Sequence, residues 1–256
     1  MRAPVSYRRD IPFFHQKTAQ EFQKDPYERY DEMVMRQAAL HLADDFWGFY
    51  PFQTHLDLAQ QYYPTSPNPH ILELGCSVGR WIGTVALQHP EAHCWGIDYS
   101  YQMLRQAHEL WVKGKGIAID LGSIGCSKNF ERPGHQLKNL QFGLSKAENL
   151  PFDDNSQDLI FNSFLLDRLE NPTKGLEEMY RILKPNGTLI LTTPLNFNQT
   201  SHWENYYPIS KIATIVQQIG YTIDSWEDSI KIREPFDLHG NEVIWNCLQF
   251  IARKTI

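Results

Sequence analysis

Short apolar segments alternate with amphipathic ones from residue 70 to the end of the chain, and this alternation constrains the fold more than any other feature. HILEL, HCWGID and DLIFNS have the length and composition of strands, and YSYQMLRQAHELW has helical spacing. Strands that alternate with helices form a mostly parallel sheet with helices on both faces. The last two strand-like runs, YTIDSW and EVIWNCLQFIARK, are joined only by a loop. The sequence therefore predicts an α/β fold with seven strands, the last of them antiparallel.

Two stretches of the chain fall outside this pattern. Residues 1–63 are rich in aromatic residues and have roughly helical spacing. This predicts an N-terminal helical segment that covers the edge of the sheet, acts as a lid over a pocket, or does both. The turn-rich PTSPNP then opens the α/β domain, which spans residues 64–256. Residues 113–136 fit no strand–helix unit, so we interpret them as an insertion before the third strand.

Charge and cysteine content narrow the classes of function. The formal net charge is −6, and Lys and Arg form no run, so the electrostatic footprint of a nucleic-acid-binding protein is missing from the sequence. The four cysteines form no CxxC pair, and we expect no metal site. No apolar run resembles a secretory signal or a membrane span. We therefore expect a cytoplasmic protein with a small-molecule substrate and neither a nucleic-acid partner nor a membrane contact; its oligomeric state stays open.

The strongest candidate for a ligand site is ILELGCSVGR, residues 71–80. A strand enters a tight turn through Gly75 and Gly79, where glycines let the backbone approach a ligand and the amides of the following helix attract anionic groups. Asp98 ends the next strand, where a carboxylate can accept both hydroxyls of a ribose. The alternative role of Asp98 is to cap the next helix, which Ser100 would do instead. The GxGxxG spacing of nicotinamide cofactors is absent.

Four blocks in order, ELGCSVGR, GIDYSYQML, AENLPFDDNSQDLIF and RILKPNGTLIL, resemble the class I S-adenosylmethionine-dependent methyltransferases. The resemblance implies a Rossmann-like fold and S-adenosylmethionine as the cofactor. It places the glycine turn around the methionine part of the cofactor and Asp98 at its ribose. It also places Tyr99 along the adenine and the end of the fourth strand beside the methyl sulfonium. The implied cofactor-binding residues are Glu73, Gly75, Cys76, Ser77, Gly79, Asp98, Tyr99, Ala147, Glu148, Asn162 and Ser163.

Two positions depart from the pattern of this family. Ser77 stands where glycine is usual, and Lys146 stands where an aspartate often binds the adenine amino group. A lysine ammonium has no lone pair and cannot accept that hydrogen bond. Either the backbone, Glu148 or the insertion takes over, or the adenine lies differently.

On the substrate side, FNSFLLDRLENP carries Asp167 and Arg168 where common small-molecule members have two histidines. Both lie at the carboxyl end of the sheet, where ligands bind in such folds; their alternative role is a surface ion pair or a helix cap. FLLDRLEN, PLNF, SHWE and WNCLQFIARK are similar to the carnosine N-methyltransferase family, which methylates an imidazole nitrogen. That resemblance implies Asp167 as its acid, His202 as its histidine and Trp245 as its aromatic residue. The ELGCS loop departs from that family, and residues 1–63 do not align with it.

We therefore expect N-methylation of an imidazole or amine of a histidine-like compound, with Asp167 and His202 as catalytic residues. Asp167 would accept the ring N–H that does not react, as carboxylate–histidine pairs do elsewhere. Arg168, Tyr207 and Trp245 are the expected substrate contacts, the aromatic ones through cation–π interaction with the product. Two alternatives remain: O- or C-methylation of a natural-product intermediate, and a protein that binds S-adenosylmethionine without transferring its methyl group.

Overall fold

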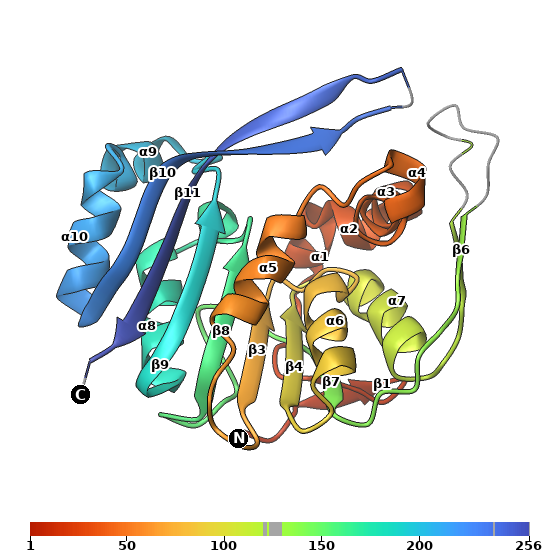
Figure 1. The fold of residues 1–256 in the computed structure, drawn as a ribbon, viewed down its shortest axis with the longest axis horizontal. Helices are drawn as coiled ribbons and strands as arrows, with labels where there is room; N and C mark the ends of the chain where they lie inside the picture. The colour runs from red at the N-terminus through yellow and green to blue at the C-terminus, as the bar shows by residue number, and fades with distance from the viewer. Residues whose placement is uncertain (120–121, 123–129, 238, 256) are drawn as a thin grey trace.

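A nine-stranded sheet forms the centre of the protein in a computed structural model that describes residues 1–119, 122, 130–237 and 239–255 (Figure 1). The strand order is β1-β2-β7-β4-β3-β8-β9-β11-β10. Strands β2 to β9 of this sheet run parallel to one another, and β11 is antiparallel to both of its neighbours. The strands are β1 (Ser6–Arg8), β2 (Ile11–Phe13), β3 (His70–Leu74), β4 (His93–Asp98), β7 (Leu140–Leu144), β8 (Gln157–Ser163), β9 (Leu183–Thr193), β10 (Tyr221–Pro235) and β11 (Glu242–Lys254).

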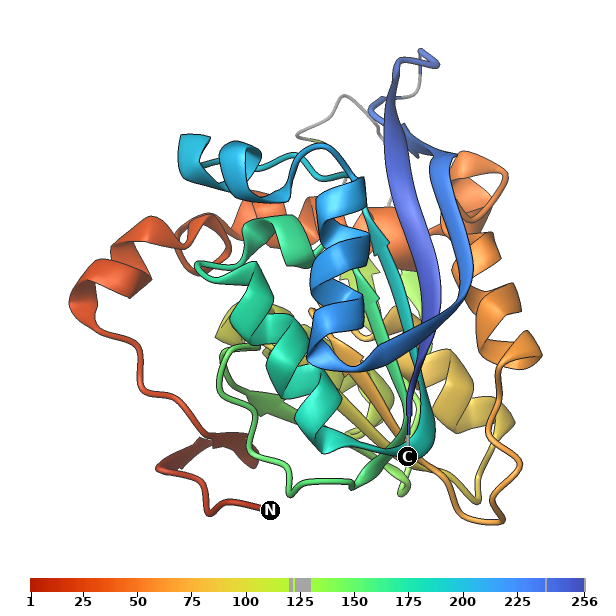
Figure 2. The same ribbon diagram turned by 90° about the vertical axis from the view of Figure 1, so that its left-hand side faces the viewer.

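Helices cover both faces of the sheet, as the alternating pattern predicts. Figure 2 shows α8 and α10 on one face and α5 and α6 on the other. Two buried apolar clusters fill the two interfaces, and the one under α5, α6 and α7 also includes residues of α3. The helices are α1 (Ala19–Lys24), α2 (Pro26–Arg29), α3 (Asp31–Leu42), α4 (Asp44–Trp47), α5 (Gln53–Gln61), α6 (Arg80–Gln88), α7 (Tyr101–Trp111), α8 (Pro172–Ile182), α9 (Thr200–Tyr206) and α10 (Ser210–Ile219).

The predicted count of seven strands is wrong, because residues 6–13 form a hairpin and not a helix. Its second strand pairs with β7 in parallel through Phe13 and Leu144, which extends the sheet at that edge. Ile11 is buried there. Strands of three residues are too short to show an alternating pattern, so their pairing depends on contacts that lie far away in the chain. The helices α1 to α5 lie in the stretch predicted to be helical, and its role as a lid stays a prediction.

Part of the predicted insertion at residues 113–136 forms a separate two-stranded sheet. β5 (Ile117–Ile119) pairs antiparallel with β6 (Phe130–Arg132). Residues 120–121 and 123–129 of the insertion, Cys126 among them, lie outside the described residues.

The C-terminal hairpin of β10 and β11 reaches beyond the sheet and passes over the N-terminal helices (Figure 1). Ile232 and Cys247 of this hairpin pack with Leu40 of α3, and the Arg36 guanidinium lies 4.7 Å from the centre of the Phe236 ring. The hairpin and α3 therefore enclose the carboxyl end of the sheet between them. No helix in the described part of the chain is long and apolar enough to cross a membrane.

Candidate active site

The turn after β3 holds its backbone in the left-handed region at three positions. Gly75 and Gly79 have φ angles of 74° and 73°, and Ser77 has a φ of 49°. The amides of Gly75 and Cys76 both donate to the carbonyl of Ile97, at 2.8 and 3.1 Å, which fixes the turn against β4. A left-handed conformation costs a residue with a side chain about 1 kcal/mol, which explains why glycine is usual at position 77. The serine keeps the shape of the turn at that cost.

Glu73, predicted to lie around the methionine part, points into the helix that follows the turn. Its Oε2 accepts a hydrogen bond from the amide of Ile82 at 3.0 Å. Burial raises the pKa of this carboxyl well above its usual range, and the Ile82 amide only partly offsets that effect. In this structure Glu73 therefore fixes the first turns of α6 behind the glycine turn.

Asp98 lies between the glycine turn and the start of α7. Its Oδ2 accepts from the Ser77 amide and its Oδ1 from the Ser100 amide, both at 2.8 Å. Ser100 itself caps α7 by accepting from the Met103 amide at 3.4 Å, so the capping role belongs to Ser100. Burial raises the pKa of Asp98, while the two amides favour its charged form. The turn and the carboxylate are thus brought together, as a ribose site requires.

The loop after β7 lies next to Asp98, because the Ser145 amide donates to the Asp98 carbonyl at 3.2 Å. Lys146 Nζ is 5.7 Å from the centre of the Tyr99 ring, and Ala147 is buried. Glu148 accepts from the amides of Glu170 and Asn171, at 3.0 and 3.4 Å. The carboxylate expected at the edge of the adenine is therefore engaged with the chain that precedes α8.

The end of β8 carries polar atoms without partners. Asn162 has no exposed surface, and neither its Nδ2 nor its Oδ1 has a hydrogen-bond partner in the part of the chain that the structure describes. Ser163 Oγ lies 3.5 Å from His55 Nδ1, and His55 Nε2 likewise has no partner among the described residues. A buried polar group without a partner costs about 1–3 kcal/mol. A ligand that supplies the missing bonds at this point would remove that cost, so these residues fit a polar cofactor.

His55 was missed by the sequence reasoning. It lies in α5, in QTHLDLAQQ, where a histidine forms no recognisable motif. Burial lowers its pKa to about 3, and burial followed by the charge of Arg80 lowers the pKa of the neighbouring His41 to about 4. Both imidazoles are therefore neutral near pH 7.

Three aromatic rings, which we call the aromatic wall, meet at Phe164, the first residue after β8. The wall consists of Phe164 and the two rings that contact it, Phe52 and Trp245. Both neighbouring rings meet Phe164 edge to face, with centroids 5.7 and 5.8 Å away. Trp245 Nε1 donates to Glu234 at 2.6 Å, and the His55 ring stacks on Phe52 with centroids 5.5 Å apart. Trp245, an expected substrate contact, thus lies beside the expected position of the methyl group.

Asp167 and Arg168 follow in a short 3-10 turn. The carboxylate of Asp167 is buried; its Oδ1 accepts from Thr193 Oγ1 at 3.2 Å and its Oδ2 from the Asn196 amide at 3.1 Å. Arg168 Nε lies 3.7 Å from the same carboxylate, and its Nη1 donates to Asn198 Oδ1 at 3.2 Å. Asp167 therefore joins the carboxyl ends of β8 and β9.

His202 and Tyr207 are surrounded by different residues from those around Trp245. His202 is buried in α9, with Nε2 3.2 Å from the carbonyl oxygen of Glu170 and the rings of Phe197 and Tyr206 around it. Tyr207 is 56% exposed just beyond that helix. The structure shows no contact of either residue with the aromatic wall, so their predicted roles require a substrate that extends toward α9.

Comparison with known proteins agrees with this geometry. Residues 72–191 match the family described as a methyltransferase domain. The ubiquinone/menaquinone biosynthesis C-methyltransferase UbiE of Rickettsia felis is 30% identical over 54% of this chain and 58% of its own length. The malonyl-[acyl-carrier protein] O-methyltransferase of Methylococcus capsulatus is 26% identical over 50% of this chain and 38% of its own. The chain thus spans little more than half the length of the first of these relatives.

Solved structures show the same fold. A chain from the complex between the Trm112 methyltransferase activator and a methyltransferase of Haloferax volcanii superimposes with a TM-score of 0.58 at 15% identity, over 91% of this chain and 99% of that one. An S-adenosylmethionine-dependent methyltransferase from Aquifex aeolicus gives 0.53 at 19% identity, over 88% and 98%. The family match, the glycine turn and the position of Asp98 agree: residues 72–191 match a methyltransferase domain, and the chain has the fold of S-adenosylmethionine-dependent methyltransferases.

Proposed function

We propose that the protein transfers a methyl group from S-adenosylmethionine to a small molecule, and that the acceptor is a neutral imidazole nitrogen or an amine of a histidine-like compound. The observation that carries the proposal is the aromatic wall immediately after Asn162 and Ser163. When bound, S-adenosylmethionine supplies an electrophilic methyl group. The chain has to hold a neutral nitrogen lone pair close to it, and positioning of this kind contributes up to ~7–11 kcal/mol in ideal cases.

The wall suits both the ring that enters and the cation that leaves. A flat neutral heterocycle packs against Phe164 and Trp245, and the positive charge that appears on methylation is attracted to their π faces. The two buried histidines nearby are neutral and do not repel that charge. This combination supports a neutral acceptor that becomes a cation.

Asp167 keeps the role that we predict for it, that of holding the second ring nitrogen. A carboxylate has about four acceptor positions, and Asp167 uses two of them on Thr193 and Asn196. Burial and then the charge of Asp167 raise the pKa of Cys247 to about 12, and Cys247 packs in the cluster that contains Phe164 and Trp245. The carboxylate therefore lies within electrostatic reach of the aromatic wall.

C- or O-methylation is the second candidate, and His55 favours it. Methyl transfer to a phenol or an acidic carbon needs a base, and the neutral imidazole of His55 is placed beside Ser163, with an Nε2 that has no partner among the described residues. Its position suits a proton acceptor, whereas its lowered pKa makes it a weak base. The names of the relatives from Rickettsia felis and Methylococcus capsulatus point to the same two reactions.

A substrate screen separates the two candidates. The purified protein is incubated with S-adenosylmethionine and, in separate reactions, with histidine, its imidazole and amine derivatives, and small phenols; mass spectrometry detects the methylated product and NMR locates the methyl group. We expect a methyl group on a ring nitrogen or an amine. A methyl group on oxygen or carbon would replace the first candidate by the second. Binding of the cofactor with no turnover on any acceptor would point to a protein without transferase activity.

Replacing Trp245 with leucine should raise the KM for the imidazole substrate by about 2- to 30-fold, because a cation–π contact contributes about 0.5–2 kcal/mol and the leucine keeps part of the packing. Binding of S-adenosylhomocysteine should stay unchanged, since Trp245 touches none of the residues of the glycine turn. Tyr7→Leu, at an exposed position of β1, is the control for a general loss of aromatic surface. An equal loss of cofactor binding in Trp245→Leu would contradict a role in substrate binding.

A further inference from the structure

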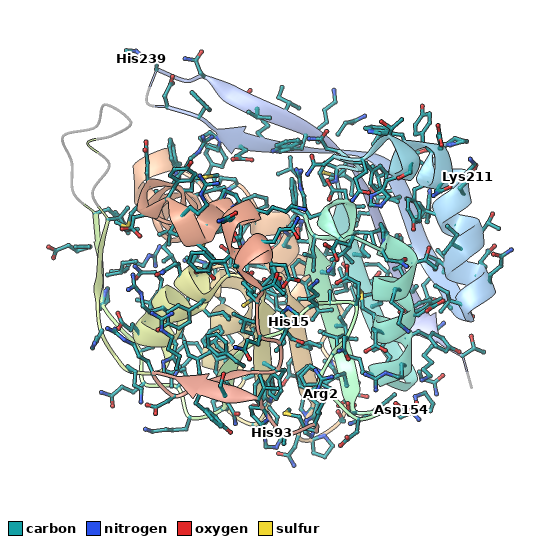
Figure 3. All side chains as sticks on the ribbon, turned by 180° about the vertical axis from the view of Figure 1, so that it is seen from behind. Arg2, His15, His93, Asp154, Lys211 and His239 are labelled. Carbon is teal, nitrogen blue, oxygen red and sulfur yellow. The ribbon has the colours of Figure 1, made fainter. Side chains whose placement is uncertain are left out.

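The N-terminal segment between β2 and α3 brings charged side chains to one part of the cofactor site. In this part the acceptor for the adenine amino group is missing, because Lys146 stands where the family often has an aspartate. Lys17 Nζ lies 4.1 Å from the centre of the Tyr99 ring, and the His15 ring lies 5.7 Å from it. Figure 3 shows His15 near the middle of the molecule, between β2 and the N-terminal helices. The resemblance to the class I methyltransferases places the base of the cofactor along Tyr99, the residue after Asp98. The segment therefore borders the site of the base.

The segment is fixed in this position by contacts with α7. Lys17 Nζ binds Asp25 Oδ2 at 2.6 Å and Glu28 Oε1 at 3.1 Å, and this cluster is almost fully shielded from solvent. Glu28 Oε1 also accepts from the amide of Tyr101 at 2.6 Å, which ties α2 to the first turn of α7. The position of α1 relative to Tyr99 is thus set by a buried ion pair and a hydrogen bond.

Glu21 of α1 is the carboxylate of this segment that lies next to Lys146 and Tyr99. Its Oε1 lies 2.6 Å from Lys146 Nζ, and its Oε2 accepts from the amide of Thr18 at 2.8 Å in a capping box. His15 Nε2 lies 3.4 Å from the same Oε2. The hydrogen bond from Lys146 and then the Thr18 amide lower the pKa of Glu21, and the pKa of Tyr99 is raised by burial and then by this carboxylate. Glu21 is therefore ionised, oriented and next to Tyr99.

Two other carboxylates, Glu148 and Glu170, are less suited than Glu21 to accept a hydrogen bond from the adenine. Glu148 accepts from two amides just before α8, whereas the carboxylates that raise the pKa of Tyr99 are those of Glu21, Glu170 and Asp25. Glu170 also reaches Lys146, at 3.3 Å, but its side chain is 77% exposed whereas that of Glu21 is 21% exposed. Water competes less for a shielded acceptor, so a hydrogen bond to Glu21 contributes more.

We infer that Glu21 accepts the hydrogen bond of the adenine amino group in place of the aspartate that the family often has at position 146, and that Lys146 is a positioning residue that holds Glu21. The inference rests on the proposed use of S-adenosylmethionine. Glu21, which lies far from position 146 in the sequence, thus supplies the acceptor that is missing there, and Lys146 holds it in place.

The test compares binding of S-adenosylhomocysteine with binding of its analogue that lacks the 6-amino group of the purine, both by calorimetry. The ratio of the two Kd values measures recognition of the amino group, and a general loss of affinity or stability cancels in it. Hydrogen bonds to charged groups contribute about 1.5–3 kcal/mol, so the wild-type protein should prefer the adenine form by about 10-fold or more.

Glu21→Ala should reduce this ratio to near 1, while Glu170→Ala, which removes the other partner of Lys146, should leave it at the wild-type value. Adding Lys146→Asp to Glu21→Ala returns an aspartate to the family's position and should restore the preference. A ratio that stays at the wild-type value in Glu21→Ala, or is near 1 in the wild type, would overturn the inference while the cofactor site stands. Failure of the wild type to bind S-adenosylhomocysteine would overturn the proposed function as well.

Discussion

Asp98→Ala should weaken binding of S-adenosylhomocysteine by at least ~100-fold, because two hydroxyl–carboxylate hydrogen bonds contribute about 1.5–3 kcal/mol each. The carboxylate is half-buried beside the glycine turn, where few solvent molecules can replace it. Its removal also leaves the amides of Ser77 and Ser100 without their acceptor, so the turn itself loses a support. Calorimetric titration of the wild-type and variant proteins measures the effect.

A matched control separates loss of the binding group from loss of local stability. Ser100→Ala removes the cap of α7 and should lower the free energy of unfolding by about 1 kcal/mol, with little change in affinity for S-adenosylhomocysteine. Thermal unfolding of both variants shows that each is folded at the temperature of the titration. If folded Asp98→Ala binds as tightly as the wild type, the ribose is not bound at Asp98 and the cofactor must be placed elsewhere.

Sequence reasoning places the glycine turn and Asp98 where the structure has them, because local pattern and local structure coincide there. The left-handed φ angles of Gly75 and Gly79 belong to a turn between a strand and a helix, and both elements show their own periodicity in the sequence. Asp98 ends the next strand in parallel register with the first, which brings it to the turn. In a parallel sheet the carboxyl ends of strands meet at one edge, so such proximity follows from strand order alone.

Contacts between distant segments could not be predicted in this way. His55 and Ser163 are 108 positions apart, and Lys146 meets Glu21 through the fold of the N-terminal segment. Nothing in the local sequence of α5 or α1 indicates these partners, because each helix only shows which of its faces is apolar. The strand β2 was missed for the same reason, since it is stabilised by its pairing with β7.

The aromatic residues show a further limit of assigning a role to a residue from its position in a family alignment. Trp203 and Tyr206 are aromatic residues that the sequence alone does not distinguish from Trp245 as an enclosure for a cationic product. In the structure the first two pack on Phe197 near α9, whereas Trp245 packs on Phe164. Alignment with a family assigns a residue to an element, but the direction of a side chain depends on the packing of that element.

Lowering the pH from neutrality to about 4.5 should destabilise the protein through His55 and His41. Their pKa values in the folded protein are about 3 and about 4, against 6.5 for an unperturbed histidine. The unfolded chain therefore takes up protons that the folded protein does not, and stability that is complete above pH 6.5 is lost as the pH falls toward these lowered values. At about pH 4.5 the loss amounts to about 2.5 kcal/mol for each histidine.

Carboxyl groups titrate as well, and their effects have both signs. The raised pKa values of Glu73 and Asp98 make stability fall as the pH rises, whereas the lowered pKa values of Glu21 and Glu178 make it fall at still lower pH. The contribution of His55 is therefore measured as a difference. Urea unfolding of the wild type and of His55→Asn is followed between pH 7.5 and pH 4.5, and any cost that the substitution has at all pH values cancels.

Between pH 7.5 and pH 4.5, the free energy of unfolding of the wild type should fall by about 2.5 kcal/mol more than that of His55→Asn. That result means that His55 is buried and neutral near pH 7, and that its lowered pKa makes it a weak base for removing a proton from a substrate. Parallel profiles would mean that water or a neighbouring charge reaches the ring and that its pKa is close to the ordinary value. In that case His55 would be a stronger base at the pH of the reaction, which would favour C- or O-methylation, while N-methylation, which needs no base, would be unaffected.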